Sequence, residues 1–74
     1  MSADKFKITL IAECEKNYAE GFEFFIAGNE FASTAILGAY AECRFLLMTM
    51  FDVPQCFFDN LEKSVEINVL DKYA

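Results

Sequence analysis

Two clusters of turn-forming residues divide this chain into three segments. They are Gly28-Asn29 and Asp52-Val53-Pro54. Glycine suits the left-handed position that ends a helix, asparagine caps the start of the next, and proline is tolerated in a first helical turn. Within the segments, apolar side chains recur every three or four residues, which is the period of an α-helix. The sequence therefore predicts one small domain, residues 1–74, with helices over about residues 4–27, 30–51 and 54–70.

The first segment is amphipathic, and Ser2 or Asp4 is expected to cap its start. Its polar positions follow one side of a helix: Lys5, Thr9, Glu13, Lys16, Glu20 and Glu23. The opposite side carries Leu10, Ile11, Cys14, Tyr18, Phe22 and Phe25. One side is thus expected to face water and the other to face a core.

The second segment is apolar on nearly every side, as is typical of a helix in the middle of an assembly. Its narrow polar stripe consists of Thr34, Glu42, Thr49 and Asp52. One face begins with small residues: Ala32, Ala35, Ala39, Cys43, Leu46 and Met50. We expect the aromatic residues of the first helix to pack against this face, so that the two helices form a hairpin hinged at Gly28-Asn29. Gly38, which lies with Phe45 between the residues of the polar stripe, is interpreted as a close-packing site.

The third segment combines a helical apolar stripe with an acidic one. The apolar residues are Phe57, Phe58, Leu61, Val65, Val69 and Leu70, and the acidic residues, expected to face solvent, are Asp59, Glu62 and Glu66. Residues 6–10 and 65–69, however, also alternate with period two, which is the pattern of a strand. An α+β fold with paired N- and C-terminal strands, formed by residues 6–10 and 64–70, is therefore the alternative to an all-α fold.

The charge balance limits which partners the chain can bind. Its 74 residues carry twelve acids and six bases, a formal net charge of −6. Phosphate backbones and anionic lipids are bound by Lys/Arg patches, so direct binding to nucleic acid or to a membrane is not expected. The chain starts with a charged amphipathic segment rather than a signal peptide, and its longest uncharged stretch is short for a bilayer span. We expect a cytoplasmic protein.

The residues that most catalytic sites require are missing. The chain contains no histidine, and Cys14, Cys43 and Cys56 form no CxxC pair, so they are interpreted as buried thiols in a reducing compartment. Its three glycines are isolated and form no phosphate-binding loop. No catalytic residue, no cofactor site and no metal site is predicted, and the chain is not expected to be an enzyme.

The candidate partner-binding site is a third face of the second helix. Its residues follow each other at spacings of 3, 4, 3 and 4: Leu37, Tyr40, Arg44, Leu47 and Phe51. Aromatic residues around an arginine are the usual composition of a protein interface. A chain of this size, 55% apolar, has more apolar surface than it can bury alone. We therefore expect the three-helix fold to be completed by homo-oligomerisation, as a dimer or a higher oligomer.

Three functions fit this pattern. The first is a non-enzymatic acidic module that self-associates and binds or inhibits a protein partner. The second is an acidic mimic of nucleic acid that inhibits a DNA- or RNA-binding or defence enzyme, because carboxylates three and four residues apart lie about 5–6 Å from each other. The third is a nucleotide-like ligand binder with a pocket between protomers, in which Tyr40, Phe45, Phe51 or Phe57 stacks on a ring and Arg44 binds an anion.

Overall fold

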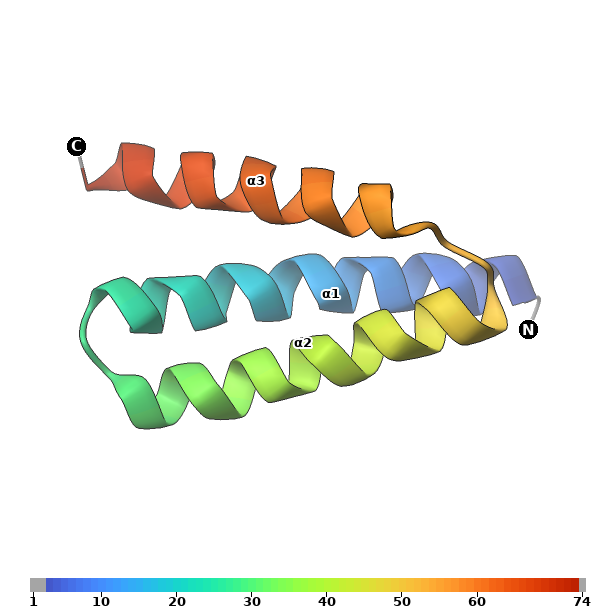
Figure 1. Cartoon of the computed structure of the whole chain (residues 1–74), viewed down its shortest axis with the longest axis horizontal. Coiled ribbons are helices and arrows are strands. Elements are labelled where there is room, and N and C mark those ends of the chain that lie inside the picture. Colours follow the sequence, from blue (N-terminus) through green and yellow to red (C-terminus); the bar gives the residue numbers. More distant parts are fainter. Residues whose placement is uncertain (1–2, 74) are drawn as a thin grey trace.

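Three helices make up nearly all of the computed structural model, which describes residues 3–73 (Figure 1). They are α1 (Ala3–Ile26), α2 (Glu30–Met50) and α3 (Gln55–Lys72). This confirms the all-α prediction of a hairpin plus a third helix, with every boundary within two residues of its expected place. Ser2, one of the two expected caps, lies outside the described residues, and Asp4 lies in the first turn of α1.

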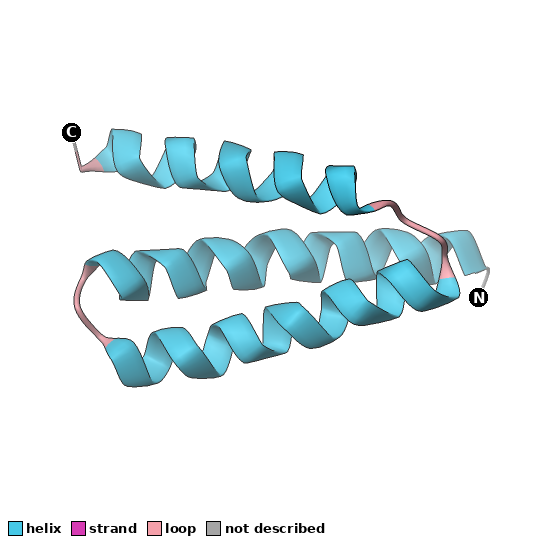
Figure 2. Ribbon diagram, viewed as in Figure 1, coloured by secondary structure: helices cyan, strands magenta, loops and turns pink. Residues whose placement is uncertain are grey.

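The alternative with paired terminal strands is wrong. Residues 6–10 lie within α1 and residues 65–69 within α3, and residues 3–73 contain no strand (Figure 2). The alternating residues do not share a face, because Leu10 and Val69 are buried whereas Ile8 and Ile67 are exposed. Five alternating residues are a weaker pattern than the helical period that continues through them on both sides.

The turn between α1 and α2 is a Schellman motif. Gly28 has a φ of 83°, the left-handed conformation that glycine adopts without a steric cost. The Gly28 N–H donates to the Phe25 carbonyl at 3.1 Å, and the Asn29 N–H donates to the Phe24 carbonyl at 2.9 Å. The Asn29 side chain then accepts from the Ala32 N–H at 3.2 Å and caps α2. The Gly-Asn pair therefore ends one helix and starts the next, as predicted.

The turn between α2 and α3 returns the chain to the core. Asp52 has a φ of 54°, a conformation that short polar residues tolerate. The Val53 N–H donates to the Leu47 carbonyl at 3.2 Å, and the Val53 side chain is buried. Pro54 precedes the first residue of α3 with a φ of −76°. This turn anchors the start of α3 beside the end of α2.

In Figure 1, α1 lies between the other two helices. Its contact with α2 is the most extensive, its contact with α3 is smaller, and α3 reaches α2 mainly through side chains. All three helices contribute to one buried cluster, together with the second turn: Leu10, Cys14, Tyr40, Leu47, Val53, Phe58 and Leu61. The fold is thus a hairpin with a third helix laid along it.

α1 and α2 pack tightly against each other at Gly21. A methyl group there would lie 2.6 Å from Cδ2 and 2.7 Å from Cγ of Leu37. The Ser33 hydroxyl donates to the Gly21 carbonyl at 3.1 Å in this buried contact. The expectation that Gly38 is the close-packing glycine is wrong, because no atom lies within 4 Å of where its Cβ would be. Gly38 is on the exposed side of α2, where nothing packs against it.

These two glycines give a matched pair of predictions. We expect Gly21→Ala to lower the free energy of unfolding by about 1–3 kcal/mol, because the added methyl overpacks the contact with Leu37. Gly38→Ala should instead raise it by about 0.5–1 kcal/mol in the monomer, because alanine is the better helix former and meets nothing. Urea unfolding at low protein concentration measures both. Equal effects of the two substitutions would contradict this packing.

Candidate protein-interaction site

The structure places the predicted partner-binding stripe inside the bundle. Leu47 is fully buried and Tyr40 is 5% exposed, while Leu37, Arg44 and Phe51 are partly buried. Within the single chain the stripe is therefore mostly covered, and what stays accessible of it belongs to Leu37, Arg44 and Phe51. Burying large apolar side chains removes more surface from water than burying alanines does, and α2 turns Tyr40 and Leu47 inward while Ala35, Ala39 and Ala41 stay exposed together with Phe31 and Phe45.

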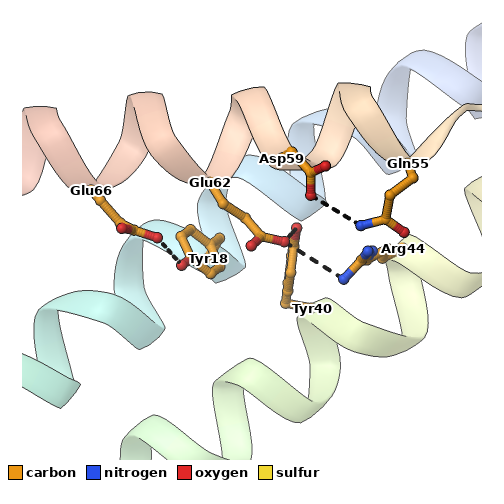
Figure 3. Close-up of polar contacts among 7 residues, drawn as sticks. All are labelled: Tyr18, Tyr40, Arg44, Gln55, Asp59, Glu62 and Glu66. Atoms are coloured by element: carbon orange, nitrogen blue, oxygen red, sulfur yellow. Dashed lines mark hydrogen bonds and ion pairs between the residues drawn. The ribbon is translucent and has the colours of Figure 1, made fainter.

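Arg44 is held at the α2–α3 contact (Figure 3). One terminal guanidinium nitrogen lies 3.7 Å from a Glu62 carboxylate oxygen, and the guanidinium carbon lies 5.4 Å from the centre of the Phe58 ring. The same Glu62 oxygen accepts a hydrogen bond from the Tyr40 hydroxyl at 2.6 Å. The Arg44 Nε is buried and has no hydrogen-bond partner. Glu62 thus satisfies two groups of α2 at once, and Arg44 is engaged within the chain.

A second tyrosine–glutamate pair lies one turn further along α3. The Tyr18 hydroxyl of α1 donates to the Glu66 carboxylate (Figure 3), and the Tyr18 and Tyr40 rings contact each other, with centroids 4.9 Å apart. The expectation that Glu62 and Glu66 face solvent is wrong. The signal that could have found them is that a tyrosine buried in a core needs an acceptor for its hydroxyl, and these two carboxylates flank the apolar stripe of α3.

Burial raises the pKa of three groups in this region. It raises the pKa of the Cys14 thiol to about 12, with a smaller contribution from neighbouring Cys43. It also raises the pKa of Tyr18 above its ordinary value of 10, reinforced by the hydrogen bond to Glu66. The pKa of Tyr40 rises for the same reasons, with Glu62 as its acceptor. All three groups therefore stay neutral in the folded chain at physiological pH.

These raised pKa values predict that the fold loses stability in alkali. Below about pH 9 the folded and unfolded chains hold the same protons on these groups, so the stabilisation is complete. Above pH 9 for Cys14, and above pH 10 for the tyrosines, the unfolded chain releases protons that the folded chain keeps. Urea unfolding between pH 8 and 11.5 should show a falling free energy of unfolding. The double variant Tyr18→Phe, Tyr40→Phe should show a shallower fall, and an unchanged slope would contradict the assignment.

The exposed side of α2 carries large apolar side chains along the whole length of the helix. We call it the outer face of α2, and all its members are exposed: Phe31, Thr34, Ala35, Gly38, Ala41, Glu42, Phe45, Leu46, Thr49 and Met50. The exposed fractions of Phe31, Phe45 and Met50 are 87%, 65% and 57%. Large aromatic side chains this exposed on one helix face make it the candidate interaction surface of the chain.

Two shallow depressions follow the outer face of α2. One, of about 410 Å³, is lined by Ala41, Glu42, Phe45 and Leu46. The other, of about 500 Å³, is lined by Glu30, Phe31, Thr34 and Ala35. Each contains one of the exposed phenylalanines, and Gly38 lies between them. Sequence reasoning missed this face, although the spacing of seven residues from Phe31 to Gly38 and from Gly38 to Phe45 could have revealed it.

The other expected functional groups are more dispersed. Cys14 is buried, but Cys56 is exposed, so the interpretation of all three cysteines as buried thiols is wrong for Cys56. Arg44 and Phe45 line a third depression, of about 230 Å³, with Ala41 and Met48. Of the rings expected to stack on a ligand, Tyr40, Phe51 and Phe57 lie inside the bundle or half inside it. Among residues 3–73, no group of three acidic or thiol side chains is placed to hold a metal ion.

By length and mean hydropathy, α2 also passes as a membrane-spanning helix. It has 21 residues, and its most apolar part has a mean hydropathy of 1.2. Glu42 and Arg44, however, both lie within it. A charged side chain near the middle of a bilayer costs about 2.5–3.5 kcal/mol or more. The composition of α2 is therefore weak evidence for a membrane span.

Comparison of the chain with protein-family models, with curated proteins and with solved structures finds no match in any of the three. The chain's own side chains are thus the basis for any functional assignment. The feature that stands out among them is the outer face of α2.

Proposed function

We propose that this chain is a non-enzymatic protein–protein interaction module that self-associates through the outer face of α2. The observation that carries the proposal is the exposure of Phe31 and Phe45 on a helix whose opposite face is already buried. Exposed aromatic rings surrounded by small residues are typical of surfaces that bind protein. The net charge of −6 on the remaining surface keeps the chain soluble and favours a basic protein partner for the assembled module.

Sedimentation velocity between 1 and 100 μM tests self-association. We expect a species of twice the 8.4 kDa monomer mass or more at the higher concentrations. Phe45→Glu should keep the chain monomeric, because it places a charge in an apolar contact. Glu13→Gln with Glu20→Gln, on the solvent-exposed side of α1, is the control and should leave the assembly unchanged. A wild-type monomer at every concentration would refute the proposal.

Salt separates the two kinds of contact that this module is proposed to make. Association through the apolar outer face of α2 should be insensitive to added salt or strengthened by it. Binding of a basic partner by the acidic surface should weaken between 0.05 and 0.5 M salt, because exposed charges are screened. If self-association is instead lost as the salt concentration rises, a charged surface, and not the outer face of α2, joins the copies.

A further inference from the structure

We infer that the outer face of α2 pairs with the same face of a second copy in antiparallel orientation, with Gly38 at the two-fold axis. This inference rests on the proposed function, and it names the occupant of the surface and its geometry. The next three observations carry it: the positions of the two phenylalanines, the charges on the face, and the area available for burial.

The first observation is the symmetric placement of Phe31 and Phe45 about Gly38. Each lies seven residues from Gly38, two helical turns and about 10.5 Å along the axis, on the same face. In an antiparallel pair centred on Gly38, Phe31 of one copy meets the depression lined by Ala41, Glu42, Phe45 and Leu46 of the other. Phe45 meets the depression lined by Glu30, Phe31, Thr34 and Ala35. Each of the two exposed rings of this face then has a matching hollow, and the contact is isologous, as a two-fold dimer requires.

The second observation concerns charge. Glu42 is the one charged residue in the middle of the outer face of α2. The antiparallel register places Glu42 of one copy opposite Thr34 of the other, whose hydroxyl can donate to the carboxylate. Because of the two-fold symmetry, this contact occurs twice in the dimer. A parallel pair would instead bring the two Glu42 carboxylates together, and like charges directly opposite each other repel. The charge pattern therefore selects the antiparallel arrangement.

The third observation is the available area. At about 150–250 Å² for a fully exposed aromatic side chain, the large apolar residues of the face expose on the order of 500 Å² in one copy. With the small residues between them, two copies reach the lower end of the roughly 1,200–2,000 Å² that stable interfaces bury. Gly38, which has open space above it, allows the two helix backbones to approach. A dimer of micromolar rather than nanomolar affinity is expected from this size.

Cross-linking tests the geometry. In a Cys43→Ala, Cys56→Ala background, Thr34→Cys and Glu42→Cys are made as separate proteins that both retain Phe31 and Phe45. A short bismaleimide should join the two proteins when they are mixed and should join neither efficiently to itself. Efficient Thr34→Cys self-cross-linking would indicate a parallel pair and overturn the inference. Cys14 remains as the buried thiol and is expected to be inert.

Gly38→Leu tests the axis independently. We expect it to raise the dimer dissociation constant at least tenfold in sedimentation equilibrium. The free energy of unfolding of the dilute monomer, measured in urea, should not fall. An unchanged dissociation constant would overturn the axis at Gly38. A wild-type chain that stays monomeric but binds phosphatidylcholine vesicles would refute the proposed function together with this inference. A wild-type dimer without the mixed cross-link would refute this inference alone.

Discussion

Replacing Phe58 by alanine is expected to lower the free energy of unfolding by about 3–5 kcal/mol, the range for deleting a fully buried aromatic ring. Phe58 is one of the largest fully buried side chains of the chain, and its ring also faces the Arg44 guanidinium. Domains of this size are stable by only a few kcal/mol. The variant should therefore be largely unfolded at 25 °C, as circular dichroism and urea titration would show.

Phe31→Ala is the matched control for this prediction. It removes the same ring from a position that is 87% exposed. In dilute solution, where the chain is monomeric, its effect on the free energy of unfolding should stay within about 0.5 kcal/mol. Similar losses in the two variants would mean that Phe58 does not occupy the core position described.

Replacing Glu62 by leucine should lower the free energy of unfolding by about 2–4 kcal/mol, although leucine is apolar and this position lies beside the core. The substitution removes the acceptor of the Tyr40 hydroxyl and the ion-pair partner of Arg44, and a buried polar group without a partner is penalised. Glu66→Leu should lower the free energy of unfolding by less, about 1–2 kcal/mol, because it removes only the acceptor of the Tyr18 hydroxyl. Urea unfolding compares the two variants.

A double-mutant cycle checks the cause of this loss. Adding Tyr40→Phe to the Glu62→Leu variant should restore part of the stability, because the phenylalanine has no hydroxyl to satisfy. Strictly additive effects of the two substitutions would show that Tyr40 and Glu62 do not interact. Tyr18→Phe in the same background is the control and should give no such rescue.

The helices could be predicted from the sequence because their signals are local. The Gly28-Asn29 pair and Pro54 mark the helix ends by their own backbone preferences, which do not depend on the rest of the chain. The longer helical period also outweighed the short alternating stretches near both ends. The fold class thus follows from residues that act within a turn or two of themselves.

Which face of α2 turns inward could not be predicted in the same way. The helix is apolar on nearly every side, so its period shows no polar side that must face water. The choice depends on how much each face buries against α1 and α3, and on where Gly21 lets Leu37 approach. The partners of Tyr18 and Tyr40 were missed for a related reason. Glu62 and Glu66 look solvent-exposed on α3 alone and become partly buried only when the three helices meet.

The way α3 is attached has a consequence for local unfolding. Because α1 and α2 share the most extensive contact, while α3 is held by a smaller one, by its buried side chains such as Phe58 and by a few side-chain bonds, we expect local opening to start with α3. Amide protons in the last turns of α3 should then exchange with solvent faster than those in the middle of α1. Each such opening would briefly expose Tyr40 and Leu47, so a chaperone or protease would meet an apolar hairpin rather than a fully unfolded chain.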